Sequence, residues 1–215
     1  MNSTRRAFLA LTAILLSGQC TGALAAAYDD FLNAVKIGNV AETKRWLSRG
    51  MDPNTVDAAS QPVLHLAARE GNVEVIKVLA DARADLNRRN GHAETAIMLA
   101  ALAGHANVVE YLISRDAQIN HPGWTPLIYA ATNGHRRIVE MLLEKHAYID
   151  GAPENGVTAL MMAARSGHED VVKVLLEEGA DASLANNRGE TASDWALVAR
   201  NTDIAALIQA RIKKP

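Results

Sequence analysis

The sequence predicts an all-α fold, a solenoid of stacked helix-turn-helix units, and two observations carry this prediction. A short unit start recurs at intervals of 33, 30, 33 and 33 residues, which is typical of repeat architectures. A unit of that size cannot bury enough apolar area alone, so neighbouring units must share one core. The equivalent starts are Pro62, Thr95, Thr125, Thr158 and Thr191.

Residues 156–183 show one unit most completely. Thr158 precedes an apolar run and is expected to cap the first N–H groups of a short helix. Gly167 is expected to end that helix in the left-handed conformation. A second helix with one apolar face is predicted over 168–178 and stops at Gly179. Each unit therefore consists of a helix, a tight turn, a second helix and an extended loop.

Other units vary at their helix ends. Pro126 is expected at the first helical position, where no N–H group is needed. The positions that match Gly179 hold Arg83, Asp116 and His146. A non-glycine residue held left-handed is strained by roughly 1–2 kcal/mol, so the sequence predicts strained backbone at these three helix ends.

Three stretches share one motif: residues 62–68 read PVLHLAA, residues 123–127 read GWTPL, and residues 156–160 read GVTAL. Gly-His follows at 167–168 and Gly-Ala-Asp at 179–181. This pattern resembles the ankyrin repeat, whose motif runs G-x-T-P-L-H-x-A-A-x-x-G-H, then an apolar helix, then G-A-D-x-N. The resemblance covers roughly residues 28–212. It implies an ankyrin-repeat solenoid with β-hairpin-like loops and a concave groove that binds other proteins.

The repeat period divides the chain into one domain of about six units. The first unit lacks the Thr-Pro start and carries charge at Asp29 and Asp30, as a terminal unit facing water requires. In the last unit, Ser193 and Asp194 replace the Leu-His of the motif. The predicted units are 28–57 (N-terminal cap), 58–90, 91–120, 121–153, 154–186 and 187–212 (C-terminal cap), followed by a tail at 213–215.

Residues 1–27 have the three-part layout of an export signal peptide that is cleaved. Arg5 and Arg6 precede a short apolar run, and small residues lead to cleavage expected after Ala25 or Ala27. The paired arginines resemble a bacterial twin-arginine signal, with the general secretory route as the alternative. We therefore expect the protein in the periplasm.

Composition excludes several classes of protein. Without Arg5 and Arg6, 20 basic residues face 24 acidic ones, so nucleic acid is not an expected partner. No later apolar run is long enough to span a membrane. The only cysteine, Cys20, lies in the signal after Gln19, which disfavours a lipid anchor. The mature chain would hold no disulfide and no thiolate metal site.

No catalytic, metal-binding or cofactor-binding motif is found, so an enzyme is not predicted. His105, His135 and His168 recur after turn glycines, too far apart to share one ion, and are interpreted as bonding backbone groups across the turn. His65 matches the family histidine that bonds the loop backbone. Solvated positions are expected for the remaining histidines, His92, His121 and His146.

The predicted function is protein–protein interaction by a monomer in the periplasm. The alternative is an accessory or protective partner of a periplasmic enzyme such as an oxidoreductase. The ankyrin resemblance implies that the groove binds through its loops and the exposed face of each first helix. The candidate partner-binding residues at those positions are Arg69, Glu94, Trp124, Tyr129, Asn133 and Arg165.

The single 30-residue interval predicts a shorter loop at residues 121–123 and a notch in the row of loops. Trp124 stands at the edge of this notch, and Tyr129 and Asn133 lie four residues apart on one helix face. Two interpretations of Trp124 remain open. It either anchors a partner or packs over its own shortened loop.

Overall fold

The structure is a computed structural model and describes residues 20–212, which form helices α2 to α13. Most of the proposed signal peptide, including Arg5 and Arg6, and the proposed tail at 213–215 lie outside the described residues. Within 20–212 the regular structure is helical, and extended pairing is limited to the isolated antiparallel bridges Val56–Pro62 and Ala185–Thr191. The all-α prediction is confirmed.

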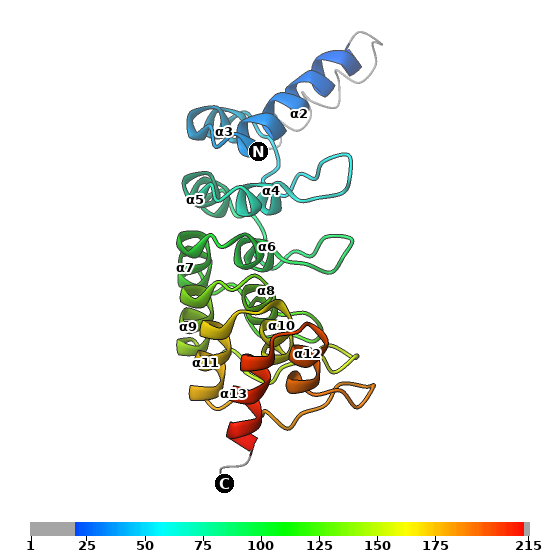
Figure 1. Cartoon of the computed structure of the whole chain (residues 1–215). Helices are drawn as coiled ribbons and strands as arrows, with labels where there is room; N and C mark the ends of the chain where they lie inside the picture. The colour runs from blue at the N-terminus through cyan, green and yellow to red at the C-terminus, as the bar shows by residue number, and fades with distance from the viewer. Residues whose placement is uncertain (1–19, 213–215) are drawn as a thin grey trace.

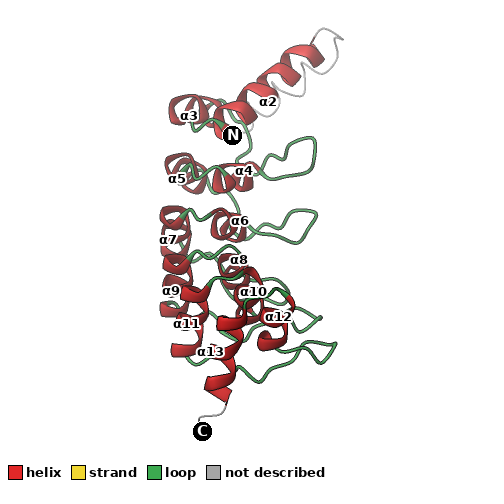
Figure 2. Cartoon of the chain, in the orientation of Figure 1, coloured by secondary structure: helices red, strands yellow, loops and turns green. Residues whose placement is uncertain are grey.

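The helices follow one another as six pairs, and the first and second helices form two stacked rows with the loops projecting to one side (Figures 1 and 2). The first helices are α2 (Cys20–Lys36), α4 (Val63–Arg69), α6 (Ala96–Ala103), α8 (Pro126–Thr132), α10 (Ala159–Ser166) and α12 (Ala192–Val198). The second helices are α3 (Val40–Ser48), α5 (Val73–Asp81), α7 (Ala106–Ser114), α9 (Arg136–Glu144), α11 (Glu169–Glu177) and α13 (Thr202–Ile212).

The core is continuous along the stack because the same positions are apolar in each inner unit. Small residues on the first helices let neighbouring helices approach closely, and larger aliphatic residues fill the space between the rows. All of these side chains are buried: Ala67, Ala100, Ala130 and Ala163; Leu64, Ile97, Leu127 and Leu160; Leu79, Leu112, Leu142 and Leu175.

The helix starts follow the sequence prediction. The side-chain oxygen of Thr158 accepts a hydrogen bond from the N–H of Met161, and Thr125 and Thr191 cap their helices in the same way. Pro126 lies in the first turn of α8, as predicted. Thr95 differs, because its hydroxyl has no hydrogen-bond partner among the described residues.

The helix ends also match the prediction. Gly167 ends α10 in the left-handed conformation with φ 83°. The φ angles of Arg83, Asp116 and His146 are 68°, 61° and 62°, so these three residues adopt the strained left-handed backbone. The strain repeats at the same position of successive units.

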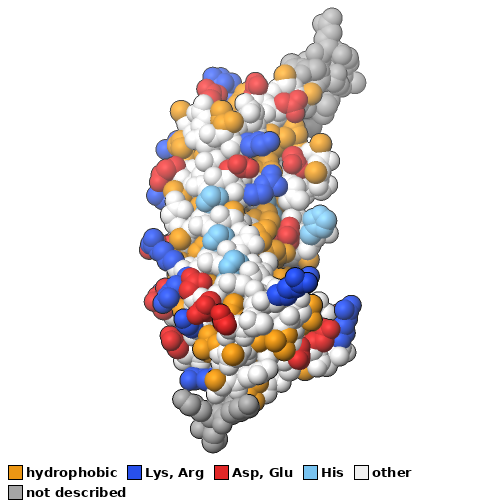
Figure 3. Space-filling view, viewed as in Figure 1, with side chains coloured by type: hydrophobic (Ala, Val, Ile, Leu, Met, Phe, Trp, Pro, Cys, Tyr) orange, Lys and Arg blue, Asp and Glu red, His pale blue; other side chains and the backbone are white. Residues whose placement is uncertain are grey.

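A column of histidines joins neighbouring units (Figure 3). The Nε2 atoms of His105, His135 and His168 lie 2.9, 3.0 and 3.0 Å from carbonyl oxygens at the first helix of the preceding unit. The prediction that these histidines bond backbone groups is confirmed, but the acceptor carbonyls belong to the preceding unit and not to the histidine's own turn. A Cβ on Gly104 would lie 2.6 Å from the ring of His135, so the turn needs glycine.

The loops are linked at their bases by a second set of contacts. A side-chain oxygen in one unit accepts a hydrogen bond from a backbone N–H of the next, at 2.8 Å for Asn54, Asn87 and Asn120 and 3.1 Å for Asp150. Asn120 directly precedes the short loop at 121–123. The shortened loop therefore keeps its base contact with the next unit.

One histidine departs from the expectation. His121, in the short loop, is half-buried, and its Nε2 atom has no hydrogen-bond partner among the described residues. The expectation that it is solvated is wrong. Partial burial of the ring lowers the pKa of His121 below its ordinary value.

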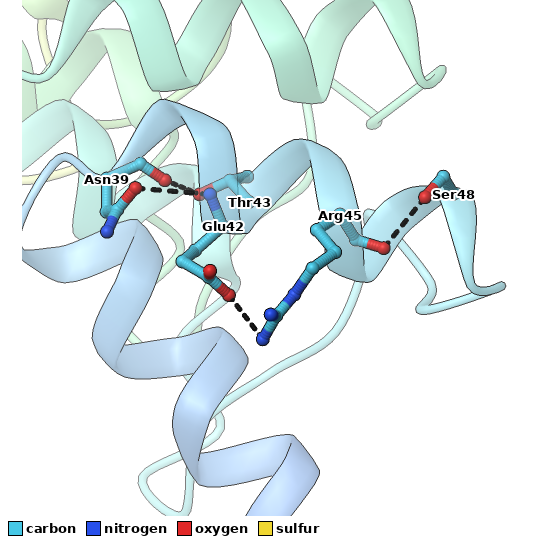
Figure 4. A network of polar contacts seen from close by, with 5 residues as sticks. All are labelled: Asn39, Glu42, Thr43, Arg45 and Ser48. Carbon is cyan, nitrogen blue, oxygen red and sulfur yellow. Dashed lines mark hydrogen bonds and ion pairs between the residues drawn. The ribbon is translucent and has the colours of Figure 1, made fainter.

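The terminal units are fixed by polar contacts of their own. Figure 4 shows the start of α3, where Asn39 Oδ1 accepts a hydrogen bond from the N–H of Glu42 at 3.1 Å. The hydroxyl of Thr43 donates to the Asn39 carbonyl at 2.8 Å, and Arg45 pairs with Glu42 at 2.6 Å. At the other end, Arg211 donates to the carbonyl of Leu176 at 3.0 Å.

Candidate functional site

The candidate site is the concave surface, formed by the first helices and the loops that project beside them. It carries two separate groups of polar and aromatic side chains. We call the first group, Asn90, Glu94, Trp124 and Tyr129, the central cluster. We call the second group, Arg165, Arg188, Glu190, Trp195, Val198 and Ala199, the C-terminal pocket.

The central cluster joins the loop before α6 to helix α8. The Tyr129 hydroxyl donates to Glu94 Oε1 at 2.9 Å, and Asn90 Nδ2 donates to Glu94 Oε2 at 2.8 Å. Asn90 also shapes the loop, because its Oδ1 accepts the N–H groups of His92 and Glu94 at 2.9 Å each. Both carboxylate oxygens of Glu94 are therefore committed within the protein.

The hydroxyl of Tyr129 remains a donor. Burial raises its pKa above the ordinary value, and the hydrogen bond to Glu94 raises it further. A charge-assisted hydrogen bond of this kind is stronger than a neutral one. It joins Glu94 in the loop before α6 to Tyr129 on α8, which is 35 residues later in the chain.

Trp124 stands beside the short loop as predicted, with 38% of its surface exposed. Its ring packs on Tyr129 with centroids 5.8 Å apart and planes tilted by 53°. The tilted arrangement is a favourable one for aromatic pairs. Trp124 thus packs within the central cluster and also presents apolar surface outward.

Two other predicted residues lie apart from these groups. Arg69 is exposed at the end of α4, with Nε 3.7 Å from Glu70. Asn133 is exposed at the end of α8, and its Nδ2 donates to the carbonyl of Leu102 in the preceding unit at 2.8 Å. Asn133 therefore contributes to the stacking of units.

The last predicted residue, Arg165, belongs to the C-terminal pocket, a hollow of about 380 Å³. Its guanidinium lies over the ring of Trp195, 5.3 Å from the centroid. The indole Nε1–H of Trp195 donates to Glu190 Oε2 at 3.0 Å.

Sequence reasoning did not select Arg188, Trp195 or Val198 for this surface. A signal was present in the repeat positions. Glu190 lies directly before a unit start, as Glu94 does, and Trp195 lies four residues after a unit start, as Tyr129 does. Because the last unit departs from the motif, it was interpreted only as a cap and not as part of a binding surface.

Within residues 20–212, no group of three or more His, Cys, Asp or Glu side chains is placed to hold a metal ion. A larger hollow of about 560 Å³ lies between the second helices α3 and α5, and its lining combines aliphatic residues with two lysines and two acidic residues, Lys44, Lys77, Glu74 and Asp81. None of the helices that the structure describes has the length and apolar character needed to cross a membrane.

Comparison with known proteins agrees with this architecture. The family model described as "Ankyrin repeats (3 copies)" matches residues 31–122, 64–152 and 149–214. The fold is also similar to a chain of the solved complex described as "Bd0816 Predatory Endopeptidase from Bdellovibrio bacteriovorus in complex with immunity protein Bd3460". That similarity has a TM-score of 0.74 and 29% sequence identity, and covers 84% of this chain and 97% of the other.

Proposed function

The chain belongs to the ankyrin-repeat family, and on that premise we propose that it is an exported immunity protein whose concave surface binds a peptidase and restrains it. The observation that carries the proposal is the similarity to a chain of an endopeptidase–immunity protein complex. That similarity extends over 97% of the matched chain at 29% identity. Protein–protein interaction is the common ground of the family and of that complex.

The surface chemistry supports binding. Exposed or half-exposed aromatic side chains, Trp124 and Trp195, lie beside charged groups on the concave side. Aromatic and arginine side chains are enriched among the residues that dominate binding energy. Arg165 and Trp195 form such a pair in direct contact.

The proposal places the protein in the periplasm, the compartment to which the signal at residues 1–27 would direct it. Helix α2 begins at Cys20, before both proposed cleavage positions, so processing after Ala25 or Ala27 would remove its first turns. Phe31 and Val35, which are buried in the core, would remain. Replacement of Arg5 and Arg6 by lysine, followed by cell fractionation, tests the twin-arginine route.

The direct test uses the mature chain from Tyr28 as bait in a periplasmic extract of its own source, with mass spectrometry of the captured proteins. A captured peptidase is then produced alone, and its cleavage of a peptide substrate is measured with increasing amounts of the mature chain. The proposal expects a one-to-one complex and a fall in peptidase activity. Capture without a peptidase, or a peptidase whose activity is unchanged in the complex, contradicts it.

A second candidate is an accessory partner that assembles or protects another exported enzyme, such as an oxidoreductase. The paired Arg5 and Arg6 favour it, because twin-arginine signals are read on proteins exported in the folded state. The same capture experiment separates the two candidates. An accessory partner would raise or preserve the activity of the captured enzyme, whereas an immunity protein would lower it.

A further inference from the structure

We infer that the C-terminal pocket binds an acidic side chain of the partner protein, with an apolar side chain of the same segment seated beside it. This inference rests on the proposed function in one respect, that the partner is a protein. It adds the chemistry of the contact and its position at the α10–α12 end of the concave surface.

One guanidinium of the pocket, that of Arg165, lies over an aromatic ring. Arg165, in the last turn of α10, stacks on Trp195, whose indole is held by Glu190. Glu190 is itself held by Asn186, which donates to the same Oε2 at 2.8 Å. Asn186 is buried, so the chain of contacts ends in the rigid base of the loop. A guanidinium positioned in this way presents its N–H groups to a carboxylate at a reduced entropic cost.

The two arginines of the pocket have no ion-pair partner among the described residues. Neither Arg165 nor Arg188 has a carboxylate within 4.0 Å, and no side-chain hydrogen bond from either guanidinium is found in residues 20–212. Other arginines of the stack are paired, for example Arg136 with Glu140 at 2.7 Å. Arg137 on α9 is also unpaired among the described residues, but the C-terminal pocket brings two unpaired guanidinium groups to one hollow.

Glu190 does not neutralise both arginines. Its Oε2 accepts two hydrogen bonds, from Asn186 and Trp195, and these bonds lower the pKa of the carboxyl, with Arg188 contributing to the same direction. Glu190 is thus a fixed carboxylate beside two guanidinium groups. Among the lining residues, two guanidinium groups face one carboxylate, so the lining carries one excess positive charge that a single carboxylate of a partner would balance; Asp194 lies near Glu190 but outside the lining.

The wall of the pocket is apolar. Val198, at the end of α12, is 86% exposed, and Ala199 lies next to it. A branched aliphatic side chain so exposed in the last turn of a helix offers surface for an apolar neighbour of the bound carboxylate. The combination selects an acidic residue flanked by an apolar one. A polyanion would meet the fixed carboxylate of Glu190 and the net negative charge of the chain.

The test needs no knowledge of the natural partner. The probes are two blocked peptides that differ in one group, acetyl-Leu-Glu-Leu-amide and acetyl-Leu-Gln-Leu-amide, titrated into the 15N-labelled mature chain. The sequence has three tryptophans, so the indole N–H signal of Trp195 is identified by comparison with Trp195→Phe. We expect the glutamate peptide to move the Trp195 signal in a saturable way and the glutamine peptide to move it little.

Variants locate the effect. Arg165→Gln and Arg188→Gln should each weaken binding of the glutamate peptide by about threefold to fivefold, the range of an exposed ion pair. Arg137→Gln, which removes an exposed guanidinium from α9 outside the pocket, is the matched control and should leave binding unchanged. Added salt should weaken the glutamate peptide selectively, because exposed charges are screened.

Two results would overturn the inference: equal shifts with both peptides, or a Trp195 signal that the glutamate peptide does not move at millimolar concentrations. Both leave the proposed function standing, since that is tested by capture of a peptidase with the whole surface. Conversely, if no peptidase is captured but the glutamate peptide selectively shifts the Trp195 signal, the inference about the pocket stands and the proposed peptidase partner is wrong. A captured partner that binds Arg165→Gln/Arg188→Gln as tightly as the parent also contradicts the inference.

Discussion

The central cluster and the C-terminal pocket are built on equivalent repeat positions but differ in charge. The central cluster holds one hydrogen-bonded carboxylate, whereas the pocket lining holds one carboxylate and two guanidinium groups. Each has a glutamate directly before a unit start, at 94 and 190, held by an asparagine four residues earlier. Each also has an aromatic hydrogen-bond donor to that glutamate, Tyr129 or Trp195. In the centre the donor comes from the next unit, whereas in the pocket it comes from the same unit.

The difference shows how one repeat position serves either stability or recognition. Glu94 uses one carboxylate oxygen to reach Tyr129 of the next unit and the other to hold Asn90 in its own loop. Among residues 20–212, no guanidinium lies over the ring of Tyr129. Glu190 accepts through one oxygen from Asn186 in the loop before it and from Trp195 after it, and the guanidinium of Arg165 lies over the ring of Trp195. The aromatic donor to Glu190 lies in the same unit as Glu190, so this bond does not join two units as the bond between Glu94 and Tyr129 does.

The largest expected effect is on stability, from removing the glutamate of the central cluster. Glu94→Ala leaves the Tyr129 hydroxyl without its acceptor and leaves the buried Asn90 amide with Gln61 Oε1 alone, at 3.1 Å, so it should lower the free energy of unfolding by about 2–3 kcal/mol. Glu190→Ala removes an acceptor from Asn186 and from the half-exposed Trp195, and should cost about 1 kcal/mol. Urea unfolding followed by circular dichroism measures both.

Glu110→Ala is the control for this comparison, because Glu110 is exposed on α7. Its cost should stay within about 0.5 kcal/mol, as for other surface substitutions. Equal costs for Glu94→Ala and Glu190→Ala would show that the two clusters contribute alike to the stack, against the distinction drawn between them.

Much of this architecture was predictable from single residues. Thr158, Pro126 and Gly167 act locally at helix ends, and the left-handed backbone of Arg83, Asp116 and His146 follows from their position in the repeat. Local chemistry repeated at a fixed period leaves few alternatives. The fold class therefore followed from the sequence.

The candidate surface was less predictable, because it depends on contacts between units. Nothing in the local sequence of Glu94 indicates that its carboxylate meets Tyr129, 35 residues later. The same holds for Asn133, whose amide bonds the carbonyl of Leu102, and for Arg165, which stacks on Trp195. Side-chain direction across a loop decides these contacts, and periodicity alone does not specify it.

A smaller effect is expected from the aromatic donors. Tyr129→Phe keeps the ring packed on Trp124 and removes only the hydroxyl, so it should cost about 1 kcal/mol of unfolding free energy. Trp195→Phe should cost less, because its indole N–H bonds within one unit at the half-exposed end of the stack.

The double variant Glu94→Ala/Tyr129→Phe sharpens this prediction. If the hydroxyl acts through Glu94, the cost of Tyr129→Phe should nearly vanish in the Glu94→Ala background. Additive costs would mean that the Tyr129 hydroxyl stabilises the stack through another contact, and the central cluster would lose its principal bond.

The smallest expected effect is a difference in pH dependence between the two regions, and it comes from His65. This residue is 1% exposed and lies 2.9 Å from the carbonyl oxygen of Glu94 through Nε2, while its buried Nδ1 has no partner among the described residues. Burial lowers the pKa of His65 below 6.5. The corresponding position of the last unit holds Asp194, whose pKa is lowered by hydrogen bonds from Thr191.

Acid should therefore weaken the centre first. As pH falls through about 6.5 the unfolded chain takes up a proton at His65 that the folded protein resists, so stability declines as the pH falls below the pKa of the unfolded histidine. The folded pKa of Asp194 is lowered, and its contribution is lost only at more acidic pH. Urea midpoints at several pH values should fall less steeply for His65→Gln than for the parent, with His121 responsible for part of the remaining slope. Identical slopes would mean that the Nδ1 of His65 reaches a proton acceptor, and the centre would then be no more acid-sensitive than the C-terminal pocket.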